Sequence, residues 1–114
     1  MITRTFEGTH TIPALGFGTW ELAPEPADGR LGAEDAVAVA LEVGYRHVDT
    51  AQAYGNEEAV GRAIAGSGID RDEVFVTTKI MPSNAAAKDV RRSTEASLRA
   101  LRLDHVDLLL LHYP

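Results

Sequence analysis

Four side chains of types that can move a proton stand near the ends of apolar runs. Asp49, Lys79 and His112 each close such a run, and Tyr54 follows in the loop after Asp49. A tyrosine has a usual pKa of about 10, so it exchanges a proton near neutrality only when a neighbouring cation favours its phenolate form. A lysine supplies that cation, an aspartate orients the lysine, and a histidine can donate to a carbonyl oxygen. Together these residue types suit proton delivery in carbonyl reduction.

Each of the four residues also has an ordinary structural explanation. An aspartate at a strand end often caps a turn or a helix, and a tyrosine often packs with its hydroxyl at the surface. A lone histidine at the end of a run commonly has no chemical role. The occurrence of the set at three successive run ends favours a site, because parallel folds build their sites there. Spacing alone leaves both interpretations open.

The apolar runs themselves predict parallel strands. They begin about thirty residues apart, which is the size of one strand with its crossover helix. The four runs are Leu15–Thr19, His47–Asp49, Val74–Lys79 and Val106–His112. Ahead of them, Ile2–Phe6 and Thr11–Pro13 flank Gly8, which predicts a short antiparallel hairpin able to cap the floor of a barrel. The sequence therefore predicts an α/β fold of four βα steps.

Helical signals separate the runs. An N-cap at Asn56, acidic residues in the first turn and Gly66 after an apolar stripe predict a helix between the second and third runs. The Ala-rich segment Gly32–Val43 predicts an earlier helix, and Ser83 or Asn84 is expected to cap a later one. The predicted sheet-facing residues of that later helix are Val90, Thr94, Ser97, Leu98 and Leu101.

Composition narrows the partners and the kinds of site. Lys and Arg number 11 against 17 Asp and Glu, a formal charge of −6, which disfavours nucleic acid or an anionic membrane as a partner. The absence of Cys leaves no disulfide or thiolate metal site, and we expect no metal centre. The first seven residues lack the apolar core of a signal peptide and no run is long enough to span a bilayer, so we expect a soluble, cytoplasmic chain.

Four stretches of the sequence resemble the aldo-keto reductase family, in the family's order and at suitable spacing. The longest runs from Gly44 to Glu57 and is similar to the signature around the family's catalytic Asp and Tyr. The others are Ile12–Trp20, Val74–Lys79 and Leu103–Pro114, which resemble the opening, lysine and histidine strands. The resemblance implies the first four βα steps of a TIM-type (β/α)8 barrel, preceded by a hairpin. It also implies reduction of aldehydes or ketones to alcohols with NADPH, which leaves as NADP+.

By position, the resemblance implies a role for each candidate. Tyr54 would donate the proton, Lys79 would favour the phenolate form of Tyr54, and Asp49 would hold Lys79. His112 would orient the substrate carbonyl. The residues implied to contact the cofactor are Gly18, Thr19, Trp20 and Asp49, and those implied to line the substrate pocket are Trp20, His112 and Tyr113. The last of these stands where many relatives have Trp, a departure that would change the pocket rather than proton transfer.

The resemblance covers essentially the whole chain, which we interpret as a single domain over residues 1–114, whereas a (β/α)8 barrel takes roughly 250 residues. Loops of the family's second half supply most contacts to the adenosine phosphates, so we expect an incomplete cofactor site. A half-barrel also exposes strand edges and the apolar run Leu108–Leu111. We therefore expect self-association, a complementing second half-barrel, or a place in a longer enzyme. Two rival functions stay open. One is a non-catalytic assembly module that has inherited the tetrad of Asp49, Tyr54, Lys79 and His112, and the other is a subunit that senses nicotinamide without turnover.

Overall fold

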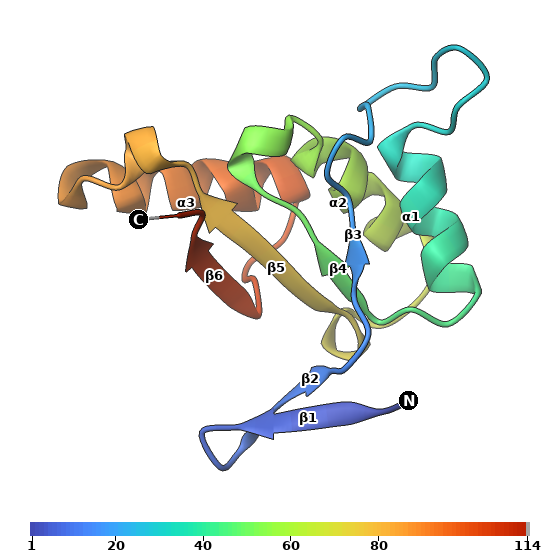
Figure 1. The fold of residues 1–114 in the computed structure, drawn as a ribbon, viewed down its shortest axis with the longest axis horizontal. Coiled ribbons are helices and arrows are strands. Elements are labelled where there is room, and N and C mark those ends of the chain that lie inside the picture. The colour runs from blue at the N-terminus through green and yellow to red at the C-terminus, as the bar shows by residue number, and fades with distance from the viewer. Residues whose placement is uncertain (114) are drawn as a thin grey trace.

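The computed structural model describes residues 1–113, so Pro114, which ends the fourth family-like stretch, lies outside the described residues. Within residues 1–113 the strands form two separate sheets (Figure 1). One is an antiparallel hairpin of β1 (Thr3–Phe6) and β2 (His10–Pro13). The other is parallel, in the order β3-β4-β5-β6. Its strands are β3 (Phe17–Gly18), β4 (His47–Asp49), β5 (Phe75–Ile80) and β6 (Leu108–Leu111).

The helices connect successive strands of the parallel sheet and lie together on one of its faces (Figure 1). They are α1 (Ala33–Glu42), α2 (Glu57–Gly66) and α3 (Ala87–Leu101). Short 3-10 turns precede α2, β5 and α3: η1 (Gln52–Tyr54), η2 (Arg71–Glu73) and η3 (Pro82–Asn84). Sequential parallel strands joined by helices on one side are the predicted half-barrel arrangement, which confirms the α/β prediction.

The hydrophobic core lies between the parallel sheet and the helices. Val48 of β4 pairs with Val76 of β5, and both side chains are fully buried on the helix side. Helix residues that complete the core are Val37, Leu41, Val60, Ala63, Ile64 and Leu101. At Gly61 the α2 backbone approaches α3 so closely that an added Cβ would lie 2.2 Å from the Leu101 carbonyl oxygen. Only glycine permits this packing of α2 on α3.

The other face of the parallel sheet carries no helix and holds the chemistry-bearing side chains. Strand residues alternate between faces, so Asp49, which neighbours the core residue Val48, points away from the helices. Asp49 pairs with Thr77 of β5, and Lys79 of β5 pairs with Leu110 of β6, so these side chains lie on the same face of the sheet. We call this surface the open face; it is formed by Asp49, Thr77, Lys79, Leu108 and Leu110.

The start of α3 and the side-chain cap of α2 differ from the local sequence signals. α3 begins at Ala87 with Ala86 as its N-cap residue, so the prediction of a cap at Ser83 or Asn84 was wrong. Both residues belong to the preceding 3-10 turn. Asn84 Nδ2 donates a hydrogen bond of 3.2 Å to Gln52 Oε1 and does not cap α3. Asn56 does stand at the N-cap position of α2, but its side chain makes no capping bond. The bounds of α1 and α2 agree with the prediction.

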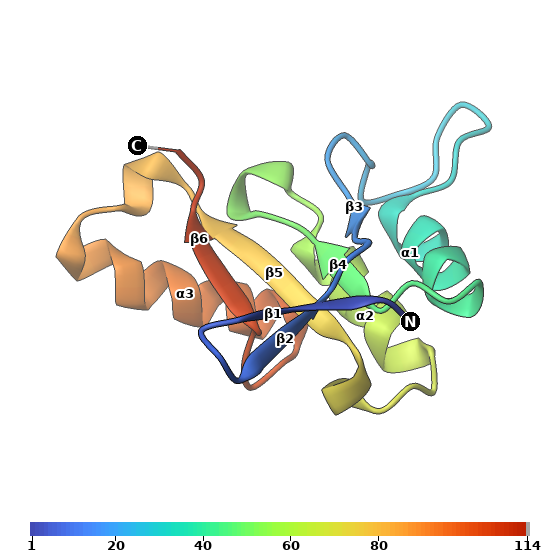
Figure 2. The same cartoon turned by 60° about the horizontal axis from the view of Figure 1, so that its bottom comes forward.

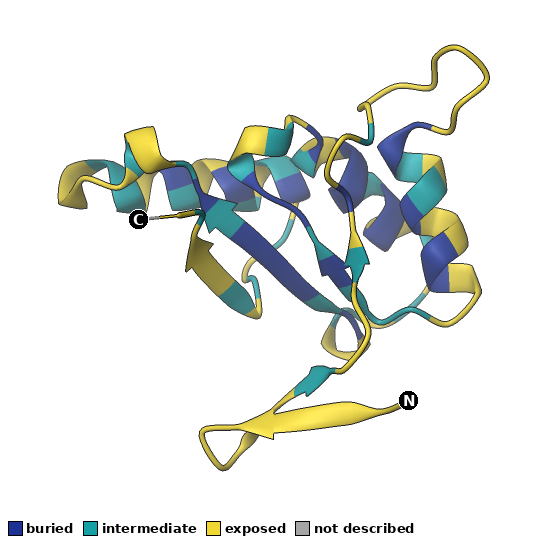
Figure 3. Ribbon diagram, viewed as in Figure 1, coloured by how far each residue is buried: buried dark blue, intermediate teal, exposed yellow. Residues whose placement is uncertain are grey.

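The hairpin lies across the end of the parallel sheet at which the strands begin (Figure 2). Its turn places Glu7 and Gly8 at φ values of 49° and 76°, the left-handed conformation that tight hairpins use. The whole of β1 is solvent-exposed, in contrast to the buried length of β5 (Figure 3). The predicted hairpin is therefore present, at the position of a barrel floor.

The helices formed by residues 1–113 are all too short or too polar to cross a membrane. Among the same residues, the His, Asp and Glu side chains form no group of three or more that could hold a metal ion.

Candidate active site

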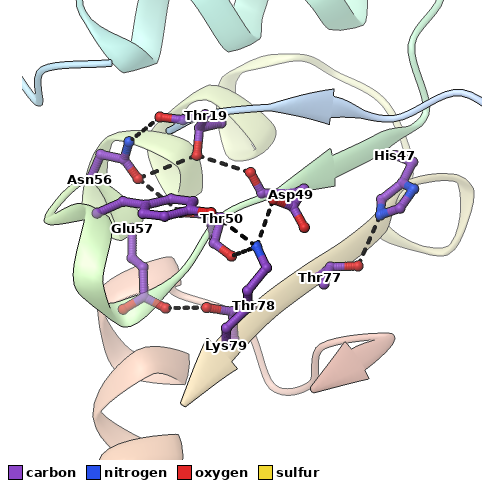
Figure 4. Close-up of polar contacts among 10 residues, drawn as sticks. Thr19, His47, Asp49, Thr50, Asn56, Glu57, Thr77, Thr78 and Lys79 are labelled. Atoms are coloured by element: carbon purple, nitrogen blue, oxygen red, sulfur yellow. Dashed lines mark hydrogen bonds and ion pairs between the residues drawn. The ribbon is translucent and has the colours of Figure 1, made fainter. Parts of the chain in front are cut away.

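Lys79 is the centre of the polar contacts on the open face. Its Nζ donates to Asp49 Oδ2 at 2.7 Å and to the Thr50 carbonyl oxygen at 3.0 Å (Figure 4). A third bond goes to the Tyr54 hydroxyl at 3.3 Å, and Nζ also lies 5.0 Å from the centre of the Tyr54 ring. An ammonium has three N–H donors, so each one has an acceptor. Because the Lys79 side chain is only 13% exposed, solvent screens its charge weakly.

The register of β4 and β5 places Lys79 beside Asp49. Asp49 pairs with Thr77, and Lys79 lies two residues further along the same face of β5. The Thr50 N–H donates to the Thr77 carbonyl oxygen at 2.9 Å, which continues the strand pairing past the end of β4. Backbone pairing therefore fixes both partners of the ion pair, and the long lysine side chain only has to reach back to the carboxylate.

Tyr54 enters the site from a short helical turn rather than from a strand. It is the last residue of η1, and Gly55 follows with φ of 69°, a conformation favoured for glycine. Gln52, the first residue of η1, accepts a hydrogen bond of 2.8 Å from the Met81 N–H through its Oε1. The turn that carries the phenol is thereby tied to the loop that follows β5.

His112 follows β6 and lies against Tyr54. Its backbone N–H donates to the Ile80 carbonyl oxygen at 3.1 Å. The rings of His112 and Tyr54 meet edge to face, with centroids 5.6 Å apart, and the exposed Tyr113 ring lies 5.1 Å from that of His112. Nδ1 of His112 is buried and has no hydrogen-bond partner among residues 1–113. The structure thus brings together Asp49, Tyr54, Lys79 and His112.

The remaining candidates come from the first strand and the loop after it. Gly18 pairs with Asp49, and an added Cβ at Gly18 would meet no atom within 4 Å, so the space above β3 is open. Thr19 is fully buried, and its N–H donates to the Asp49 carbonyl oxygen at 3.0 Å. Trp20 is 69% exposed. The backbone next to Asp49 is therefore followed by open space at Gly18 and by a loop that carries an exposed aromatic residue.

The sequence model of the Aldo/keto reductase family matches residues 14–114, most of the chain. The chain belongs to this family. An aldo-keto reductase of Mycolicibacterium smegmatis is 48% identical over 112 residues, which are 98% of this chain and 38% of that protein. One of Mycolicibacterium paratuberculosis is 53% identical over 105 residues, which are 92% of this chain and 35% of that protein.

Solved structures of aldo-keto reductases share the fold. The crystal structure of an aldo/keto reductase from Brucella melitensis has a TM-score of 0.91 and 42% identity, and covers 99% of this chain and 41% of that one. The Bombyx mori aldo-keto reductase in complex with NADP has a TM-score of 0.87 and 37% identity, with 99% and 38% covered. The chain therefore spans between 35% and 41% of the length of these relatives.

Two polar residues that contact the elements around Lys79 were not assigned a site role from the sequence. Asn56 is fully buried, and its Oδ1 accepts a bond of 2.8 Å from Thr50 Oγ1. Glu57 accepts from Thr78 Oγ1 at 2.7 Å and from Ser97 Oγ at 3.3 Å, which joins the start of α2 to β5 and α3. Both lie in the long family-like stretch, which holds more polar residues than a helix start requires. That excess was the available signal.

His47 lies on the same side of β4 as Asp49, two residues before it. Its Nε2 is 2.9 Å from Thr77 Oγ1, and its ring packs edge to face on Phe75. Burial lowers the pKa of His47 below the usual 6.5, although the nearby Asp49 carboxylate acts in the opposite direction. An added Cβ at Gly16, the residue before β3, would lie 2.9 Å from the imidazole Nδ1, so a larger residue there would displace the ring.

Proposed function

We propose that this chain carries the proton-transfer residues of an NADPH-dependent oxidoreductase that reduces aldehyde or ketone carbonyls to alcohols. The observation that carries the proposal is the contact of Lys79 Nζ with both Asp49 Oδ2 and the Tyr54 hydroxyl. A cation beside a phenol stabilises the phenolate, which is the form left when the phenol gives up its proton. Family membership supports the same reaction class.

The proposed roles follow from the contacts. The Tyr54 hydroxyl donates its proton to the substrate carbonyl oxygen, and Lys79 stabilises the phenolate that remains. Asp49 orients Lys79 through their 2.7 Å contact. His112 donates a hydrogen bond to the same carbonyl oxygen and turns the substrate toward the phenol. When bound, NADPH supplies the hydride that reduces the carbonyl carbon.

The residues around the cluster fit the nicotinamide end of the cofactor. Gly18 leaves open space above β3, and Trp20, two residues later, is exposed. Thr19 holds the backbone between them by its bond to Asp49. We propose that Gly18, Thr19, Trp20 and Asp49 border the nicotinamide and that Trp20, His112 and Tyr113 border the substrate. The cofactor phosphates would then be held by a part of the barrel outside residues 1–114.

We further propose that residues 1–114 form one domain that associates with a second half-barrel along β6. Leu109, Leu110 and Leu111 are 36%, 39% and 51% exposed, and β6 is an edge strand of the sheet. A strand edge with exposed leucines is a template for another strand. The occupant is a second copy, a separately supplied half-barrel, or the rest of a longer enzyme to which residues 1–114 belong. The same observation supports a second candidate function, a non-catalytic assembly module.

Tyr54→Phe tests the enzymatic proposal. The chain is mixed with the remaining segment of a relative such as the Mycolicibacterium smegmatis protein, and NADPH oxidation is followed with an aldehyde. Removal of the phenol should lower kcat by on the order of 10²- to 10⁴-fold. NADPH affinity, measured by cofactor fluorescence, should stay unchanged. Equal turnover by both proteins would reject the role of Tyr54, whereas association without turnover in either would favour the assembly module.

The mass in solution tests the association. The chain alone, and its mixture with the complementing segment, are measured by light scattering, and Leu110→Glu is compared with the parent. The charged side chain should shift the mass toward that of one chain, because the leucine would be covered in the complex. A parent chain that is monomeric alone and in the mixture would reject the proposal.

A further inference from the structure

Asn56 has an unusually complete set of polar contacts for one side chain. It is 0% exposed. Its Nδ2 donates to the Thr19 carbonyl oxygen at 2.8 Å and to the Leu22 carbonyl oxygen at 3.1 Å. Its Oδ1 accepts from Thr50 Oγ1 at 2.8 Å and is 3.5 Å from Thr19 Oγ1 (Figure 4). Both amide donors and the acceptor are therefore used within the protein.

These contacts join two loops that border the site. The carbonyl oxygens of Thr19 and Leu22 begin and end the segment that carries Trp20, which we call the Trp20 loop (residues 19–22). Asn56 itself comes two residues after Tyr54, directly after the turn that carries the phenol. One amide side chain thus spans the gap between the first and second βα loops.

The same side chain also reaches the ion pair through its hydroxyl partners. Thr50, whose hydroxyl donates to Asn56, presents its carbonyl oxygen to Lys79 Nζ at 3.0 Å. Thr19, whose carbonyl accepts from Asn56, donates through its hydroxyl to the Asp49 carbonyl oxygen at 2.9 Å. The backbone at Asp49 and Thr50, which includes the carbonyl oxygen that binds Lys79, is therefore connected to the Trp20 loop through Asn56 and Thr19.

We propose that Asn56 is a positioning residue that holds the Trp20 loop at a fixed distance from Tyr54 and Lys79. The proposal rests on the proposed function, because it assigns the Trp20 loop to the cofactor side and Tyr54 to the proton-donating side of one site. Asn suits this task because its amide offers two donors and an acceptor in one plane. Asp has the same shape but turns a carboxylate oxygen toward two carbonyl oxygens.

The first experiment uses Trp20, the single tryptophan of the sequence, as a reporter. Time-resolved fluorescence anisotropy is measured for the full chain, for Asn56→Asp and for the matched control Glu57→Gln. Glu57 is the next residue and also bridges elements, but its partners Thr78 and Ser97 lie outside the Trp20 loop. Asn56→Asp should raise the amplitude of fast Trp20 motion about twofold, and Glu57→Gln should leave it unchanged. Equal anisotropy decays in parent and Asn56→Asp would overturn the proposal.

A second measurement needs no variant and so covers the case in which Asn56→Asp fails to fold. Hydrogen exchange of side-chain amides is followed by NMR in the unaltered chain. The Asn56 amide protons should exchange at least about tenfold more slowly than those of the half-buried Asn84. Exchange at the same rate for the two would overturn the proposal, because a residue that clamps two loops cannot be open to water.

Kinetics separate this proposal from the proposed function. In the associated enzyme, loss of the Asn56 contacts in Asn56→Asp should lower kcat by about 10²-fold, because the reacting groups would be misplaced. Unchanged kcat in Asn56→Asp would overturn the positioning role. Absence of turnover in the parent would instead reject the proposed function, and the anisotropy and exchange experiments would still decide the structural role of Asn56.

Discussion

The β4–β5 strand pair and the β6 strand belong to one parallel sheet but differ in how firmly their side chains are held. Val48 and Val76 are fully buried against the helices, and on the other face Asp49 and Lys79 are joined by a bond of 2.7 Å. β6 pairs with β5 along its whole length, yet three of its four leucines are exposed to solvent. Strand pairing alone does not bury a strand. The central strands β4 and β5 have a neighbouring strand on each edge, and their core residues Val48 and Val76 pack against the helices.

The largest expected effect comes from the polar side of the central strands. Lys79→Met removes the cation while it keeps an unbranched side chain of similar length. In the associated enzyme we expect kcat/KM to fall by on the order of 10³-fold, because the phenolate loses its stabilising partner. Steady-state kinetics with an aldehyde measure this. A loss below tenfold would show that the Tyr54 proton moves without the lysine.

The next effect concerns the apolar side and compares two leucines. Leu101→Ala empties a fully buried site between α2 and α3, and we expect a loss of about 3 kcal/mol in the free energy of unfolding. Leu111→Ala, on the half-exposed edge strand, should cost less than about 0.5 kcal/mol in the same urea titration. Similar losses at both sites would mean that β6 is already covered in solution, by a partner that the sheet edge recruits.

The smallest effect is a pH dependence that belongs to His47. Its folded-state pKa lies below 6.5 because of burial, so the unfolded chain takes up the proton first as the pH falls. The stability that the neutral imidazole provides is complete above about pH 6.5 and is lost as the pH drops toward the folded-state pKa. His47→Gln should therefore flatten the stability profile below about pH 6.5. Parallel profiles for parent and variant would contradict the burial argument.

The parts of the fold that the sequence predicted are those fixed by neighbours in the chain. α2 is bounded by Asn56, two acids and Gly66 within one short segment, so its start and end were predictable. The start of α3 was not, because Asn84 bonds to Gln52, thirty-two residues earlier, and leaves the helix uncapped by its side chain. Local signals describe what a residue can do, whereas tertiary partners decide which of those options is used.

The candidate site shows the same limit. Asp49, Lys79 and His112 were predicted as site residues because they end apolar runs, and the structure brings them together with Tyr54. The task of Asn56 did not follow, since its side chain bonds to residue 19, thirty-seven positions earlier. The helical and strand periodicities of the sequence do not predict a contact between residues 19 and 56. The roles of these residues in a reaction stay predictions that the kinetic comparisons address.

The three acceptors around Lys79 Nζ limit which substrates it can help to bind. Asp49, Thr50 and Tyr54 already occupy its three N–H donors. A substrate that bears a carboxylate or phosphate therefore finds no free donor on this lysine and must obtain its anion contact elsewhere. The arrangement of these three acceptors around one nitrogen also disfavours arginine at this position. The five donors of arginine lie in one plane and cannot converge on three oxygens that surround a single point. Lys79 therefore serves the Tyr54 phenol and has no donor left for an anionic ligand. We expect the surrounding loops to determine which ligand binds.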